Sequence, residues 1–135
     1  MTLMRFIASC GLILMTLITG CARFGAVDAA RKSMQADALV TINGFEFVPK
    51  SITIKSGQTV EWNNTAAFET HTITADPKLA KKSEDIALPA GAEPFNSGDL
   101  SPGAVYRHTF TVPGTYRYIC IPHEGMGMIG QIEVK

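Results

Sequence analysis

The sequence predicts an all-β domain built as an antiparallel sandwich or barrel. Short runs of alternating apolar and polar residues recur from Ala38 to the end of the chain, and glycine or proline residues separate them. Because successive side chains of a strand point to opposite faces, each run offers one face for burial. The length of 135 residues allows one such domain.

The expected strands follow one another from residue 38. Their apolar faces are formed by Val40 and Ile42, by Ile52 and Ile54, by Val60 and Trp62, and by Tyr106, His108 and Phe110. Residues 71–75 are also extended. Pro113-Gly114 turns the chain into Tyr116–Ile119, and Ile132 and Val134 alternate in the last strand.

Residues 76–97 interrupt this rhythm and are interpreted as a surface excursion between two strands. Asp76-Pro77 is expected to start a short helical turn through Lys78–Asp85, because proline is well tolerated at a helix start. The expected core aromatic residues are Phe45, Phe47, Trp62 and Phe110. His108 lies in mid-strand and is expected to be structural or partly exposed.

The N-terminal segment has the pattern of an export signal. Arg5 precedes an apolar run, Phe6–Ile18, which is shorter than the roughly 20 residues that a membrane-spanning helix needs. The following Leu17–Cys21 resembles a bacterial lipobox, in which the cysteine is lipidated and becomes the new N-terminus. An ordinary signal cleaved after Ala36-Asp37-Ala38 is the alternative.

The predicted organisation is therefore a signal peptide of the lipoprotein type at 1–20, a tether at 21–37 and a folded domain at 38–135. This organisation predicts an exported protein at a periplasmic or cell-surface face, anchored to a membrane through lipid on Cys21. Cys10 would leave with the signal, so only Cys120 would remain in the fold. A lone thiol in an oxidising compartment is a liability that a metal bond would remove.

The segment from Cys120 to Met128 is the strongest chemical signal. It places a thiolate, the imidazole of His123 and a thioether on one loop between two strands, while His71 starts another extended run. Two histidines, one cysteine and a distant methionine are the ligand set of blue-copper electron-transfer sites. Structural zinc sites do not commonly use methionine, so the set favours copper.

The domain resembles a known family. The motifs that carry the resemblance are Phe47-Val48-Pro49, Gly57–Asn64, His71, Phe95–Gly98, Thr109–Thr111, Pro113–Tyr116 and the loop from Cys120. They are similar to those of plastocyanins, pseudoazurins and their bacterial relatives, the cupredoxins. The resemblance implies an eight-stranded antiparallel Greek-key β-sandwich that binds one copper ion near one end.

The resemblance also implies the ligands His71, Cys120, His123 and an axial methionine. Plastocyanin-like spacing selects Met128, whereas the shorter amicyanin loop would select Met126; the length of this loop favours Met128. Three positions depart from the family, and one of them is Ile119, where plant plastocyanins carry a tyrosine used in docking. Ile121 stands where a serine or threonine is frequent, and Thr72 stands where plastocyanins have asparagine. Neighbours of ligands tune metal sites, so the reduction potential does not transfer.

The predicted function is single-electron transfer by a type 1 copper site that cycles between Cu(I) and Cu(II), in transient complexes with redox proteins. The alternative is a periplasmic protein for copper storage or delivery. A copper enzyme would need further histidine ligands, and the chain has only three histidines. With 12 basic and 12 acidic residues, no charge excess points to nucleic acid, and a monomer is expected.

Overall fold

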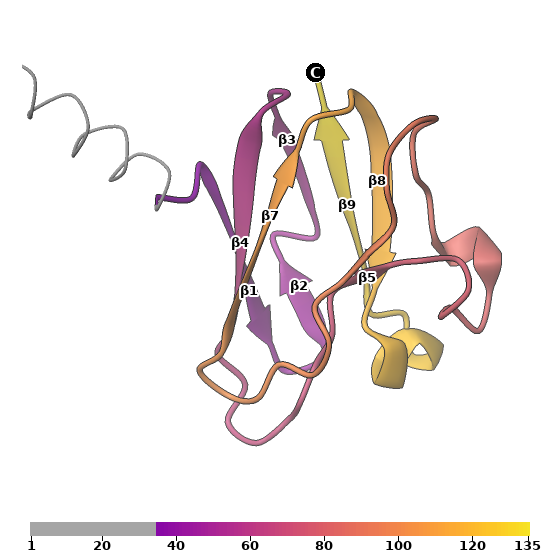
Figure 1. Cartoon of the computed structure of the whole chain (residues 1–135). Helices are drawn as coiled ribbons and strands as arrows, with labels where there is room; N and C mark the ends of the chain where they lie inside the picture. The colour runs from indigo at the N-terminus through magenta and orange to yellow at the C-terminus, as the bar shows by residue number, and fades with distance from the viewer. Residues whose placement is uncertain (1–34) are drawn as a thin grey trace, which may run out of the picture. The chain divides into compact units, whose positions relative to one another are not determined.

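The computed structural model describes residues 35–135, which form two β-sheets facing each other (Figure 1). The predicted signal peptide and most of the predicted tether lie outside the described residues. No helix within residues 35–135 is long and apolar enough to cross a membrane.

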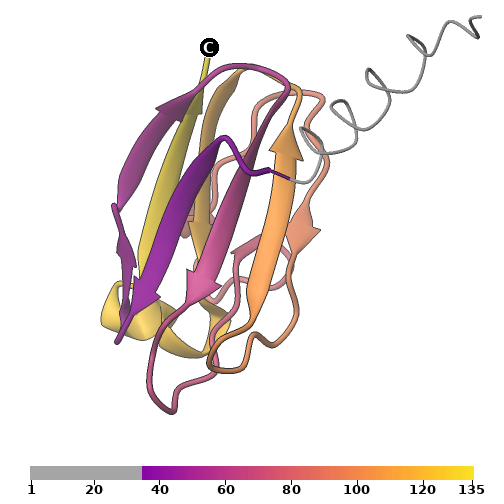
Figure 2. The same cartoon turned by 90° about the vertical axis from the view of Figure 1, so that its left-hand side faces the viewer.

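The first sheet has four strands in the order β2-β1-β4-β7. Their bounds are β1 Ala38–Asn43, β2 Glu46–Val48, β4 Gln58–Asn64 and β7 Val105–Phe110. Figure 2 faces this sheet, with β7 in orange at its edge. β4 pairs with β1 in parallel and with β7 in antiparallel orientation.

The second sheet has five strands in the order β3-β9-β8-β5-β6. Their bounds are β3 Ser51–Ile54, β5 Thr74–Ala75, β6 Phe95–Asn96, β8 Gly114–Ile119 and β9 Ile129–Val134. β3 runs parallel to β9, and β9 pairs with β8 over six residue pairs. The segment that follows β8 lies at the end of the sandwich opposite the C-terminus (Figure 1).

The all-β sandwich class is confirmed, with two differences in detail. Residues 35–135 contain nine strands where eight were expected. The count includes the short strands β2, β5 and β6, which have three, two and two residues. Two strand pairs are parallel where an antiparallel arrangement was expected. Parallel neighbours cannot be joined by a tight hairpin, so the chain reaches each of them by crossing between the sheets.

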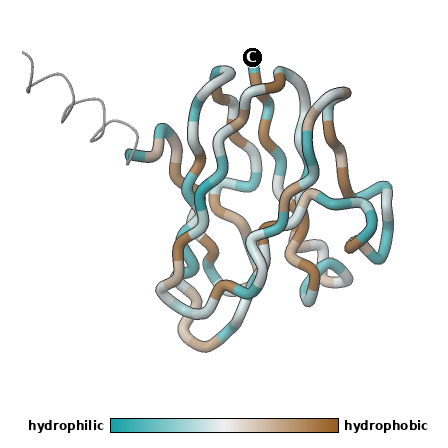
Figure 3. The backbone as a smooth tube through the Cα atoms, in the orientation of Figure 1, coloured by the Kyte–Doolittle hydropathy of each residue, from teal (hydrophilic) through white to brown (hydrophobic). Residues whose placement is uncertain are grey.

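The core lies between the two sheets and follows the predicted alternation. Val40, Ile42, Val60 and Trp62 are all fully buried, and apolar positions alternate with polar ones along the strands (Figure 3). The Trp62 ring lies 5.4 Å from that of Tyr118 on the opposite sheet, in an edge-to-face arrangement. Such aromatic pairs stabilise beyond the area they bury, so this contact ties the two sheets together.

Two expectations outside the core have different outcomes. His108 is partly buried and stacks 4.2 Å from Phe95, which confirms a structural position. The helical turn expected over Lys78–Asp85 is smaller: the only helical element there is the 3₁₀ turn η1, Ser83–Asp85. Asp76 does begin a turn, since its Oδ1 accepts a bond of 2.9 Å from the Lys78 N–H. The 3₁₀ geometry is used in short pieces of this kind.

Candidate metal centre

Three potential metal ligands converge from two segments of the second sheet. His71 lies just before β5, where its backbone exchanges two hydrogen bonds with Leu100, of 3.1 and 2.8 Å. Cys120 follows β8, and His123 lies in η2, the 3₁₀ helix Ile121–Met126 between β8 and β9. Pairing on both sides of this loop holds the cysteine and the second histidine at one end of the sandwich.

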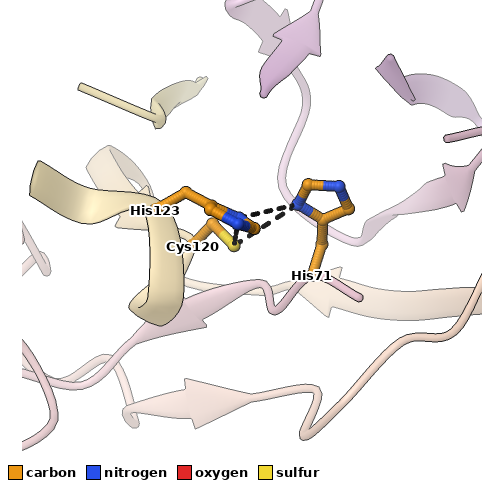
Figure 4. Close-up of side chains that lie close together, drawn as sticks. All are labelled: His71, Cys120 and His123. Carbon is orange, nitrogen blue, oxygen red and sulfur yellow. Dashed lines mark hydrogen bonds between the residues drawn. The ribbon is translucent and has the colours of Figure 1, made fainter. Parts of the chain in front are cut away.

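The donor atoms of these residues face one another (Figure 4). The Cys120 Sγ lies 3.5 Å from Nδ1 of His71 and 3.3 Å from Nδ1 of His123, and the two Nδ1 atoms are 3.2 Å apart. All three atoms lie within 4.8 Å of one another. The expected convergence of His71, Cys120 and His123 is therefore present in the structure.

The thiol and one imidazole are fully removed from water. Burial raises the pKa of the Cys120 thiol, and a bond from the Thr72 N–H to Sγ, 3.3 Å long, opposes that rise. Burial, followed by repulsion from His123, lowers the pKa of His71. Both shifts favour neutral groups when no cation is bound. A metal ion would supply the charge that stabilises a thiolate, so its binding would release the thiol proton.

Burial distinguishes the two methionines of the loop. Met128 is 1% exposed and belongs to the core, whereas Met126 is 62% exposed. Gly127 has a φ of 79°, a left-handed conformation that glycine adopts readily, and there the chain turns back between the two methionines. A bond of 3.1 Å from the Cys120 N–H to the Met128 carbonyl closes the loop.

Thr72 braces the ligand loop, a role that was not predicted from the sequence. Its Oγ1 accepts a bond of 2.9 Å from the N–H of Ile121. Thr74 donates to the same oxygen at 3.1 Å. The ligand loop is therefore braced by a hydroxyl from the opposite segment.

Phe45 corrects one expectation. It was expected in the core but is 40% exposed, and its ring lies 4.7 Å from that of His123. The cause is local: Phe45 precedes β2, where the chain passes the metal end of the sandwich, and the β2 residue that points inward is Phe47. Phe45 therefore shields one side of the His123 ring.

The donor set fits copper better than other common metals. A thiolate and two imidazoles in a compact, mostly buried group match the trigonal part of a blue-copper site, and the buried thioether of Met128 belongs to the same loop. The absence of a second thiolate within residues 35–135 sets the group apart from the usual structural zinc sets.

Comparison with known proteins gives a consistent result. The family model of copper binding proteins, plastocyanin/azurin family, matches residues 34–135. Plastocyanin of Chlamydomonas reinhardtii is 42% identical over 108 residues, covering 74% of this chain and 68% of the relative. Plastocyanin of Oryza sativa subsp. indica is 35% identical over 105 residues, covering 76% of this chain and 65% of the relative.

Solved structures show the same fold. A mutant plastocyanin of fern has a TM-score of 0.55 at 26% identity, with 72% of this chain and 99% of that chain covered. A copper-containing nitrite reductase from Thermus scotoductus has a TM-score of 0.58 at 33% identity, with 73% of this chain but only 22% of that chain covered. The second similarity therefore concerns one part of a much longer chain.

Proposed function

The chain belongs to the plastocyanin/azurin family of copper-binding proteins, and we propose that it carries single electrons between redox proteins through one copper ion. The observation that carries this proposal is the convergence of three donor atoms within 4.8 Å. The proposed ligands are His71, Cys120, His123 and Met128. When bound, the copper ion would accept and donate one electron by alternating between Cu(I) and Cu(II).

The scaffold suits this task because it holds the ligands on paired strands. A rigid site needs little rearrangement when the oxidation state changes, which keeps the barrier to electron transfer low. Thr72 links the two ligand segments, since its N–H bonds to the Cys120 sulfur and its hydroxyl bonds to Ile121. These contacts act like the outer-shell partners that orient ligands in other metal sites.

We propose that the chain acts as an electron carrier and not as an enzyme. Copper enzymes need additional imidazole ligands, and the whole sequence contains three histidines. Two of them belong to the candidate centre, and His108 stacks on Phe95. The similar nitrite reductase is a far longer chain, of which this one covers 22%. A lone electron carrier is the function that these residues support.

An absorption spectrum and a voltammogram of the copper-loaded protein test the proposal. A carrier should show an intense visible band in the Cu(II) form and a reversible one-electron wave, and copper should remain bound through repeated cycles. A storage or delivery protein would release the ion in one oxidation state. Loss of copper during cycling, or a colourless Cu(II) form, would count against electron transfer.

Substitution of the two loop methionines tests the axial ligand. Met128→Gln should lower the reduction potential and change the visible spectrum, because an amide oxygen is a harder donor that favours Cu(II). Met126→Gln is the matched control and should change both much less, since Met126 is 62% exposed. Voltammetry of the two variants decides the assignment, and the reverse order of effects would assign Met126 as the ligand.

We also propose that the chain is exported and anchored to a membrane by lipid on Cys21, within the segment that lies outside the described residues. The support is the lipobox-like sequence Leu17–Cys21. In a bacterial host that processes lipoproteins, the wild type should fractionate with membranes and Cys21→Ala should not. Mass spectrometry that found an unmodified N-terminus near residue 39 would contradict the anchor.

A further inference from the structure

Glu124 is a buried carboxylate beside a proposed copper ligand. It follows His123 in η2 and is only 4% exposed, whereas glutamate is rarely buried unless it has partners. Its two oxygens each accept a backbone N–H: Oε2 from Lys81 at 2.8 Å and Oε1 from Lys82 at 2.9 Å. Hydrogen bonds to an ionised carboxylate are short and strong, so this is a firm two-point attachment.

The segment that donates these bonds is itself held to the sandwich from a second side. It is residues 76–94, the part of the predicted excursion that lies between β5 and β6. There the Arg117 guanidinium of β8 donates to the Glu84 carbonyl, and the Arg117 backbone exchanges bonds of 3.2 and 2.9 Å with Ala87. The excursion is therefore attached to a central strand at one point and to the ligand loop at another. Figure 1 shows η1 on the same side of the molecule as η2, above it in this view.

We infer that Glu124 is a positioning residue, which holds His123 in place by fastening the ligand loop to the excursion. This inference rests on the proposed function, because it takes His123 as a copper ligand. His123 is the ligand most in need of support: it is partly exposed and lies in a short 3₁₀ helix, whereas His71 and Cys120 are fully buried. The excursion thus acts as an outer support of the copper centre.

The geometry makes distinct predictions for three substitutions. Glu124→Gln keeps the length, but its amide has one acceptor oxygen, so only one of the two N–H groups keeps its partner. Glu124→Asp keeps the charge but is one methylene shorter and should lose both bonds. Glu84→Gln is the matched control: its exposed carboxylate lies on the same excursion, and the backbone carbonyl that bonds to Arg117 is unchanged.

Amide hydrogen exchange of the metal-free protein tests the attachment. The amides of Lys81 and Lys82 should exchange at least about tenfold faster in Glu124→Asp than in the wild type, because hydrogen bonds to charged groups are lost. In Glu124→Gln one of these two amides should stay protected from exchange. In Glu84→Gln both should stay protected. Equal exchange in Glu124→Asp and the wild type would overturn the inference.

Copper binding tests the positioning role itself. Glu124→Asp should bind copper about 10- to 100-fold more weakly, as for the loss of other outer-shell partners, and should shift the visible band and the potential. Glu124→Gln should change the copper affinity, the visible band and the potential less than Glu124→Asp does. Glu84→Gln should match the wild type in all three. Unchanged spectrum and affinity in Glu124→Asp would refute the positioning role alone. A wild type that binds no copper would refute the proposed function as well.

Discussion

Replacing Cys120 by serine is expected to abolish the visible absorption of the Cu(II) protein. The Cys120 sulfur lies 3.3–3.5 Å from the Nδ1 atoms of both histidines, so it is one corner of a compact group of three donors. Serine has a similar shape, but its oxygen is a harder donor and remains protonated. Charge transfer from sulfur to copper, which produces the intense colour, would no longer occur.

The measurement is a visible spectrum at a known copper content. Cys120→Ser is expected to retain some copper through His71 and His123 and to be almost colourless. His108→Asn is the control, because His108 stacks on Phe95 outside the donor group and its loss should leave the band in place. A Cys120→Ser variant with the band of the wild type would end the type 1 assignment.

The strand pattern of the sequence predicts the fold well wherever alternation is strong. Val40 and Ile42, and likewise Val60 and Trp62, are buried as their period of two requires. The nine-strand count is less accessible, because strands as short as Thr74–Ala75 carry no periodic signal. The parallel pairing of β1 with β4 could not be predicted either, because it depends on how the chain crosses between the sheets and not on the local sequence.

The candidate site shows the same division between local and distant information. His71, Cys120 and His123 are chemically distinctive residue types, and their convergence could be predicted from motif and spacing. The supporting contacts could not. Glu124 bonds to backbone groups 42 and 43 residues away, and a backbone donor has no signature in the sequence. The only available signal for Thr72 was its departure from the family pattern.

Phe45 shows why aromatic composition alone misplaces a residue. Its hydrophobicity predicts burial, yet it is 40% exposed beside His123. Burial depends on which face of which strand a residue occupies, and Phe45 lies outside the regular strands. An exposed aromatic residue at a functional end of a domain is therefore a feature that only the tertiary structure identifies.

Gly130→Ala is expected to destabilise the domain strongly, although it adds only one methyl group. Gly130 of β9 lies directly opposite Tyr118 of β8 in the sheet register. A Cβ at this position would lie 2.3 Å from Cζ and 2.4 Å from the hydroxyl oxygen of Tyr118. The ring has no room to move, since it lies 4.8 Å from the Phe47 ring and 5.4 Å from the Trp62 ring.

The expected cost is about 3 kcal/mol of unfolding free energy, the upper end of the usual range for overpacked cores. For a domain of this size, such a loss should lower Tm by more than about 10 °C. Thermal unfolding of the metal-free protein measures this loss.

Gly125→Ala is the matched control, because its added Cβ would have no neighbour within 4 Å. Tyr118→Leu should relieve part of the Gly130→Ala cost, since residues in contact are energetically coupled. If Gly130→Ala were as stable as Gly125→Ala, the Tyr118 ring would not lie against Gly130. That result would contradict the described contact between Tyr118 and Trp62 across the two sheets.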